Sequence, residues 1–174
     1  RGLVDATGSG GQEGAETGKP TILCGGWEQD DAKAEPVMEH YARALNRMGP
    51  AGSGQKTRMV NQIAIAGLVQ GLSEALHFAE QAELAVAKGV DVVSKGAAQS
   101  WQMENRWQTM VKNEFEFGFA VDWMRKDLSI AIEESQRNGA TLEVTKLVDR
   151  FYAEIQEMGG RRWDTLSLIA RLES

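Results

Sequence analysis

The spacing of apolar residues along the chain changes at about residue 30. Before this point, LVDATGSGGQEGAETGKPTILCGG is rich in glycine, has little helical periodicity and contains a β-forming run at 21–24. This pattern predicts two short strands joined by a glycine-rich loop. After this point, apolar side chains recur at helical spacing for most of the remaining chain.

The first predicted helix begins with Asp30 or Asp31 as its N-cap. One side of it carries Val37, Met38, Tyr41, Ala42, Leu45 and Met48. Gly49 and Pro50 then end this helix, and Ser53 is expected to cap the next. From Ser53 to about Ala82 there is no proline, so we expect one uninterrupted helix of roughly 45 Å.

Small side chains recur every four residues along this long helix, at Gly67, Gly71, Ala75 and Ala79, and Ile63 continues the same seam. Glycine inside a helix costs about 1 kcal/mol relative to alanine, so this seam predicts that another backbone approaches closely. The approaching backbone belongs either to the same chain or to a second subunit, and the spacing does not decide between them.

Further helices are predicted at Val90 to Met110, at 121–138 closed by Gly139, at 143–158 closed by Gly159, and at 165–172 begun by Asp164. NEFEFGFAVD lies between the first two as a connector that buries phenylalanines. The expected fold is therefore mainly α: a helical domain built on one long central helix over residues 49–174, preceded by a short α/β segment over 1–48.

Composition narrows the class of protein. The chain has 174 residues, of which 42% are apolar and 25% charged, as in soluble globular domains. A net charge of −6 argues against nucleic acid or an anionic membrane as partner. Cys24 is the single cysteine, so no internal disulfide forms and a reducing compartment is expected. Without a long apolar run or a signal-peptide core, a cytoplasmic location is predicted.

GPAGSGQKT, residues 49–57, resembles a phosphate-binding loop in which one residue is out of place. Gln55 occupies the position of the loop lysine, and Lys56 comes one residue late. The segment before it has helical spacing, whereas a phosphate-binding loop follows a buried strand. A helix stop followed by a helix start is the favoured interpretation.

One arc of the long helix presents Arg58, Asn61 and Gln62 together, with Lys56 nearly opposite. A guanidinium beside carboxamides can orient a small oxygenated anion, although a solvated helix start has the same composition. The glycine turn GSGG at 8–11 can hold an anion through its backbone N–H groups, or serve only as a hairpin loop.

Other constellations argue against further chemistry. His40 and His77 lie far apart in the sequence and lack neighbours with zinc-ligand spacing, so no metal is predicted. The same scarcity of histidine argues against a Ser-His-Asp or Cys-His arrangement. The tryptophans are expected to anchor the core and interfaces.

Four motifs in order, VDATGSGGQEGAETG, TILCGG, GPAGSGQKTRMVNQ and FAVDWMRKDL, closely resemble the β-hydroxyacid dehydrogenases, the family of 3-hydroxyisobutyrate dehydrogenase and tartronate semialdehyde reductase. The helical domain of this family is also similar to that of 6-phosphogluconate dehydrogenase. The resemblance implies a Rossmann domain that binds NAD or NADP, and a helical domain that completes the active site and forms a homodimer or homotetramer.

By this resemblance, residues 1–48 are the end of a truncated Rossmann domain. The first βαβ unit and the dinucleotide glycine fingerprint are absent from the sequence. We therefore expect a fragment that binds no dinucleotide and is inactive alone.

The resemblance assigns substrate binding to Ser9, Gly10, Gly11, Asn61 and Gln62. Ser9 and the glycines correspond to the loop that binds the substrate carboxylate. Asn61 and Gln62 correspond to the polar pair after the catalytic position.

On the cofactor side, the resemblance assigns Phe119 to an apolar wall, and Lys126 and Asp127 to the KDL motif beside the nicotinamide. The catalytic position itself departs from the family, because Arg58 replaces its usual lysine. A guanidinium can stabilise an alkoxide but is a poor proton shuttle. The reaction is then slow or altered, another group carries the proton, or the chain is a noncatalytic variant.

Two more departures affect the expected function. Ile65 stands where 6-phosphogluconate dehydrogenases have a glutamate, which argues against decarboxylation of a sugar acid. Glu83 replaces a helix-ending glycine, which predicts that the long helix continues further. The expected function is an NAD(P)-dependent oxidoreductase of small 3-hydroxyacids or semialdehydes. The alternatives are a noncatalytic helical dimerisation module and an imine reductase relative.

Overall fold

The computed structural model describes residues 2–9, 16–18 and 20–173. The chain forms two compact units, Arg1–Ile63 and Ala64–Ser174. Among the described helices, none combines the length and apolar character that crossing a membrane requires.

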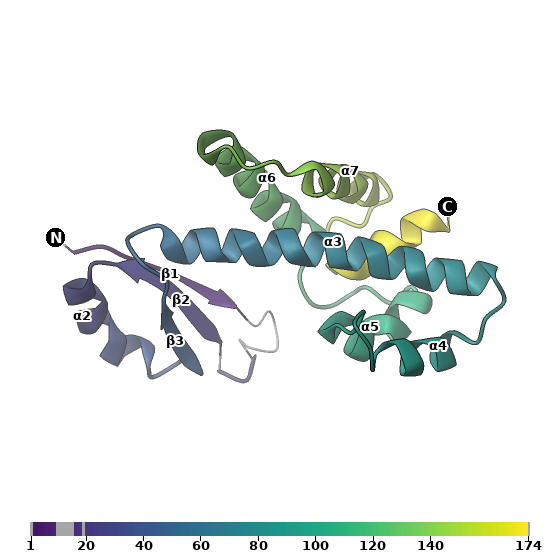
Figure 1. Ribbon diagram of the computed structural model, residues 1–174, viewed down its shortest axis with the longest axis horizontal. Helices are drawn as coiled ribbons and strands as arrows, with labels where there is room; N and C mark the ends of the chain where they lie inside the picture. Colours follow the sequence, from purple (N-terminus) through teal and green to yellow (C-terminus); the bar gives the residue numbers. More distant parts are fainter. Residues whose placement is uncertain (1, 10–15, 19, 174) are drawn as a thin grey trace. The chain divides into compact units, whose positions relative to one another are not determined.

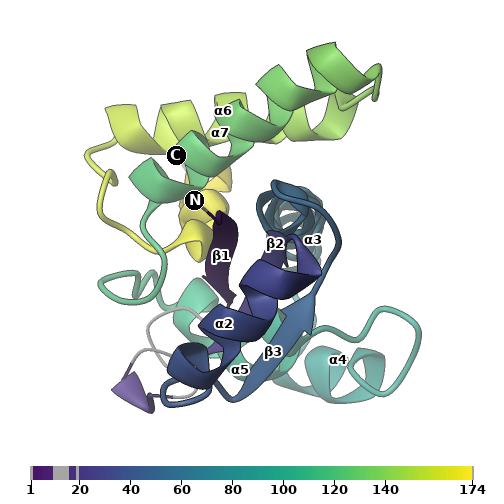
Figure 2. The ribbon, with the colours of Figure 1, turned by 90° about the vertical axis from the view of Figure 1, so that its left-hand side faces the viewer.

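The first unit is a three-stranded sheet with one helix packed on it. Strand β1 (Val4–Ser9) pairs antiparallel with β2 (Thr21–Gly26), and β2 pairs parallel with β3 (Ala44–Arg47). Helix α2 (Glu28–Met38) lies against the sheet (Figure 2). Met38 packs there with Ile22 and Cys24. The two strands predicted at the start of the chain are confirmed.

The helix predicted to run from Asp30 or Asp31 to Met48 is wrong at both ends. It begins at Glu28, with Trp27 as N-cap and no side-chain cap, and it ends at Met38. The segment after it folds as β3, whose backbone pairs with β2 and extends the pairing through the bond from Met48 N to the Cys24 carbonyl. Four residues of an edge strand are too few for the apolar spacing to distinguish strand from helix.

Helix α3 (Ser53–Gln81) follows, and the boundary between the units falls within it. The prediction that this helix continues past residue 82 is wrong, because Glu83 takes a left-handed conformation with φ of 55°. The Leu84 N–H bonds to the Ala79 carbonyl. Glu83 therefore ends the helix in the conformation that glycine usually supplies.

The two glycines of the α3 seam differ in how closely other atoms approach them. A Cβ at Gly67 would meet Val144 Cγ1 at 3.8 Å, whereas a Cβ at Gly71 would meet nothing within 4 Å. Within the described part of the chain, close packing therefore does not require glycine at 71.

The second unit is helical (Figure 1). The helix predicted at Val90 to Met110 is two helices, α4 (Val86–Val93) and α5 (Trp101–Val111). The break arises because Ser100 is extended and accepts a hydrogen bond from Met103 N, which starts a new helix. Helices α6 (Val121–Asn138) and α7 (Glu143–Glu157) lie side by side. The last element, η1 (Thr165–Leu172), is a 3-10 helix capped by Asp164.

One apolar core holds the second unit together. Fully buried side chains from α3, α5, α6, α7 and η1 meet there, among them Val69, Met110, Met124, Tyr152 and Leu168. The phenylalanine connector is irregular, and Phe115 is buried in this core with Phe117 and Phe119 packed against it. The predicted burial is confirmed for Phe115, whereas Phe117 and Phe119 are half-buried.

Candidate functional site

Hydrogen bonds join strand β1 to the first turns of α3. Asp5 Oδ2 accepts from the Gln55 backbone N–H at 3.1 Å. One helical turn later, Arg58 Nη1 donates to the Gly8 carbonyl at 2.9 Å. The guanidinium therefore lies against the backbone immediately before Ser9.

Glycines allow this close packing. A Cβ at Gly54 would lie 2.6 Å from the Leu23 carbonyl oxygen, and one at Gly25 would lie 2.6 Å from the Pro50 carbonyl oxygen. Real Cβ atoms do not approach backbone so closely. The glycines of the TILCGG and GSGQ motifs thus bring the start of α3 onto β2 at backbone distance.

The carboxamides follow on the same helix. Asn61 Nδ2 donates to Gln62 Oε1 at 2.8 Å. Gln62 is buried, with 4% of its surface exposed, and Asn61 is exposed. Of the substrate-binding residues predicted from the sequence, Gly10, Gly11 and the Ser9 side chain lie outside the described residues, so their place beside Arg58 stays a prediction.

The GPAGSGQKT loop follows a strand and not a helix. A strand, β3, does precede it, so the objection drawn from helical spacing is wrong. A stronger objection replaces it, because the Asp5 carboxylate already accepts from the Gln55 N–H in the first turn of α3. A phosphate would need such N–H groups and would meet a negative charge.

Lys126 and Asp127 lie on the first turns of α6. The Lys126 ammonium contacts Asp127 Oδ1 at 2.9 Å, and the exposed side-chain fractions are 62% and 7%. The Phe119 ring lies 5.8 Å from the Trp123 ring, between centroids. The exposed Lys126 ammonium is thus held by the buried Asp127 carboxylate. The Phe119–Trp123 ring pair lies close to both residues in the sequence.

The neighbouring residue Arg125 fixes α6 to α7. Its Nε and Nη2 donate to the Asp149 carboxylate at 3.0 and 3.2 Å, and its Nη1 donates to Gln156 Oε1 at 2.6 Å. The bond to Asp149 raises the pKa of the Arg125 guanidinium. The helix that carries Lys126 is therefore held by charge-assisted bonds.

Asp164 fixes the connector that leads into α6. Its Oδ2 accepts from Phe119 N at 2.7 Å and its Oδ1 from Leu166 N at 3.0 Å. Burial raises the pKa of the Asp164 carboxyl above its usual range, although the N–H groups of Leu166 and Phe119 act in the opposite direction. Gly118 makes room for this contact, since its φ is +70° and a Cβ would lie 2.0 Å from Oδ2.

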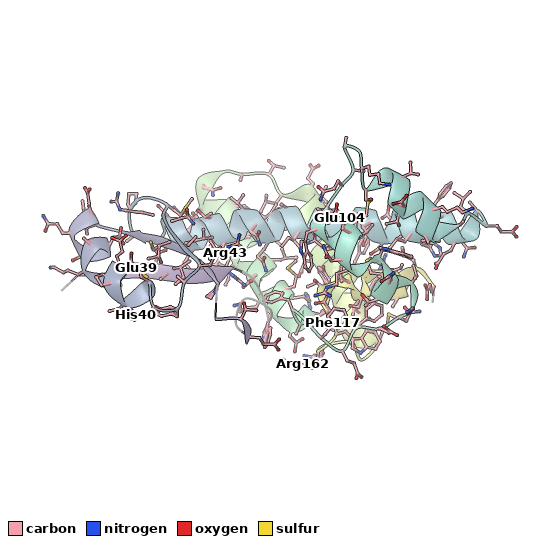
Figure 3. The ribbon with its side chains drawn as sticks, turned by 90° about the horizontal axis from the view of Figure 1, so that it is seen from below. Glu39, His40, Arg43, Glu104, Phe117 and Arg162 are labelled. Atoms are coloured by element: carbon pink, nitrogen blue, oxygen red, sulfur yellow. The ribbon has the colours of Figure 1, made fainter. Side chains whose placement is uncertain are left out.

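His40 lies exposed at the end of α2 (Figure 3), where its Nδ1 is 2.6 Å from the Pro36 carbonyl. Within the described ranges, no group of three His, Cys, Asp or Glu residues could hold a metal ion.

Asp5 is the site residue that sequence reasoning missed. A charged residue inside a predicted strand, VDATGS, was the available signal. An aspartate there needs a specific partner, and the first turn of α3 provides one.

Two family profiles together match nearly the whole chain. One, described as the NAD-binding region of NADP-dependent 3-hydroxyisobutyrate dehydrogenase, matches residues 52–172, and the other, described as the NAD-binding domain of 6-phosphogluconate dehydrogenase, matches residues 1–49. The chain is also 57% identical to an uncharacterized oxidoreductase of Shewanella frigidimarina, over 98% of this chain and 59% of that protein.

Two further relatives carry descriptive names. A probable mitochondrial 3-hydroxyisobutyrate dehydrogenase-like protein of Arabidopsis thaliana is 35% identical, over 98% of this chain and 51% of that protein. The structure of Mycobacterium tuberculosis 3-hydroxyisobutyrate dehydrogenase with L-serine is similar with a TM-score of 0.88 and 26% identity, over 98% of this chain and 61% of that one.

These matches define a class of NAD(P)-dependent oxidoreductases. The chain belongs to the β-hydroxyacid dehydrogenase family. It spans about half to three fifths of the length of the relatives that it matches.

Proposed function

We propose that this chain forms part of an NAD(P)-dependent oxidoreductase that interconverts a small 3-hydroxyacid and the matching semialdehyde. The observation that supports this most directly is the hydrogen bond from the Arg58 guanidinium to the Gly8 carbonyl. It brings the residue at the family's lysine position to the start of the Ser9 turn. Family membership and the L-serine in the similar mycobacterial structure, itself a 3-hydroxyacid, are consistent with this substrate class.

In this proposal residues 9–11 and helix α3 together bind the acid. Ser9, Gly10 and Gly11 hold the carboxylate through backbone and hydroxyl donors. Asn61 and Gln62 orient the rest of the molecule, since a carboxamide both donates and accepts. The hydrogen bond from Asn61 Nδ2 to Oε1 of the buried Gln62 fixes the orientation of the exposed Asn61 carboxamide.

Arg58 faces the reacting oxygen. Oxidation removes a hydride from the carbinol carbon and a proton from its oxygen. A guanidinium keeps its protons up to pH ~12, so Arg58 stabilises negative charge on the oxygen and does not take up the proton. The proton passes to water, and in the reverse direction the alkoxide takes a proton from water.

The family implies a nicotinamide dinucleotide, and the chemistry of α6 and of the connector before it fits such a group. An exposed ammonium at Lys126 and aromatic surface at Phe119 offer a cation and an apolar contact, which suit a charged cofactor with an aromatic ring. We assign these two residues and Asp127, which holds the ammonium, to its binding. When bound, the cofactor accepts or donates the hydride.

We also propose the domain assignment expected from the sequence. Residues 1–48 form the C-terminal end of the cofactor-binding domain, and residues 49–174 form a helical domain that binds substrate. The separate profile matches at 1–49 and 52–172 support a boundary between these two segments. The homodimer or homotetramer is proposed through the helical domain, for which the open glycine at position 71 of α3 is suitable.

The test is a substrate panel with the protein in its full natural length. Purified enzyme is assayed with NADH and NADPH against tartronate semialdehyde, and with NAD and NADP against 3-hydroxyisobutyrate and L-serine. Cyclic imines serve as the contrasting substrates. We expect turnover of at least one hydroxyacid or semialdehyde pair. Turnover of imines alone, or of nothing in the panel, would contradict the proposal.

A further inference from the structure

The two bonds between β1 and α3 have the same sequence offset. Asp5 pairs with Gln55 and Gly8 with Arg58, each across 50 positions. Three residues of strand extend ~10 Å, whereas three residues of helix rise only ~4.5 Å. The short Asp5 side chain can reach α3 only where the two backbones lie close together. The long Arg58 side chain spans the larger distance between the backbones at Gly8.

The Asp5 carboxylate sits between β2 and the start of α3. A Cβ at Gly25 would lie 2.4 Å from Oδ1, and one at Gly54 would lie 3.2 Å from Oδ2. Oδ1 is buried and has no hydrogen-bond partner in the described structure. Leaving a buried carboxylate oxygen without a hydrogen bond costs free energy, so joining the strand to the helix through Asp5 lowers the stability of the fold by that amount.

A negative charge at this place is nevertheless favourable. The first N–H groups of a helix lack partners within the helix and carry partial positive charge. Asp5 lies on β1, whereas the strand that precedes α3 in the chain is β3. The bond from the Gln55 N–H to Asp5 therefore fixes the position of α3 relative to β1. A cap within the loop would stabilise the helix without fixing that position.

We propose that Asp5 is the positioning residue of the site, and that it acts through Arg58. By holding Gln55 against β1, it sets the first turn of α3 and so places the next turn beside the Gly8 carbonyl. Ser9 follows directly in the chain. This inference rests on the proposed function, because it concerns the placement of the residue assigned to the reacting oxygen.

A double-mutant cycle tests this coupling in the full-length protein. Asp5→Ala is expected to lower kcat about 100-fold, the loss typical of a misplacement of ~1 Å. Asp5→Asn keeps an acceptor for the Gln55 N–H and is expected to lose about 10-fold, because the charge is gone. In an Arg58→Ala background, the added loss from Asp5→Ala is expected to fall below about 3-fold, since coupled residues are not additive.

Glu35→Gln is the matched control, because it removes one negative charge from an exposed side chain of the same unit. It is expected to leave kcat unchanged. Equal losses from Asp5→Ala in both backgrounds would indicate a merely structural role and overturn the proposal. Wild-type kcat in Asp5→Ala would do the same.

Amide hydrogen exchange separates this inference from the proposed function. Asp5→Ala is expected to speed exchange at the Gln55 N–H at least about 10-fold, while amides in the middle of α6 keep their wild-type rates. If the wild-type protein turns over no hydroxyacid, the proposed function fails and this measurement still reports whether Asp5 holds α3. Unchanged exchange at Gln55 would overturn the positioning role.

Discussion

Gly25→Ala should disturb the contact on which the candidate site depends. The added methyl carbon would lie 2.6 Å from the Pro50 carbonyl oxygen, 2.9 Å from Ser53 N and 2.4 Å from Asp5 Oδ1. Ordinary contacts begin at 3.4 Å. Because two of the three contacted atoms are backbone, the start of α3 has to move away from β2 by a large fraction of an ångström.

Forcing an extra methyl group into packed structure costs about 1–3 kcal/mol. We therefore expect Gly25→Ala to lower the free energy of unfolding by about 2 kcal/mol in urea titration, with an unchanged m-value. A shift of the α3 start also moves Arg58, so kcat should fall as much as 100-fold.

Gly8→Ala is the matched stability control in the same sheet, since the nearest atom to its Cβ is Pro20 Cβ at 3.9 Å. Its free energy of unfolding should stay within about 0.5 kcal/mol of wild type. If Gly25→Ala unfolds at the same urea concentration as Gly8→Ala, the described packing of α3 on β2 is wrong.

Three further predictions concern the second unit and the end of α3. Gly118→Ala should destabilise by about 2–4 kcal/mol in urea titration, because φ is +70° and the Cβ would clash with Asp164 Oδ2; a loss below 1 kcal/mol would contradict this. Burial raises the pKa of the Asp164 carboxyl in the folded protein above 3.8, so its contribution to stability is complete below the unfolded-state pKa and is lost as pH rises through the folded-state pKa. Asp164→Asn should therefore remove this loss of stability from a plot of the free energy of unfolding against pH. The same slope in the variant and the wild type would refute the assignment. Glu83→Gly should stabilise by about 0.5–1 kcal/mol by thermal unfolding, since Glu83 has φ of 55°; destabilisation would show that the left-handed conformation is not strained.

The elements with strong local signals were predictable from the sequence. Gly139 ends α6 with φ of 82°, and Asp164 caps η1 through the Leu166 N–H. These signals act over one helical turn, so the sequence alone displays them. The first two strands were also predicted, because a β-forming run borders glycine.

Features set by distant pairing were not predictable in the same way. Strand β3 forms because its backbone pairs with β2, about twenty residues earlier, and its own side chains fit a helix equally well. The role of Asp5 depends on a contact 50 positions away. The resemblance to a family named Arg58 as a site residue, but only the folded chain shows its bond to the Gly8 carbonyl.

The most direct test of the account is the kinetic effect of removing the Arg58 guanidinium from the full-length protein. Arg58→Ala should lower kcat/KM for the best hydroxyacid by about 100- to 1,000-fold, the loss typical of one preorganised donor to a developing oxyanion. Lys56→Ala, which removes an exposed cation from the same helix, should leave it unchanged. An Arg58→Ala enzyme that keeps wild-type kcat/KM would contradict the central claim that this residue faces the reacting oxygen.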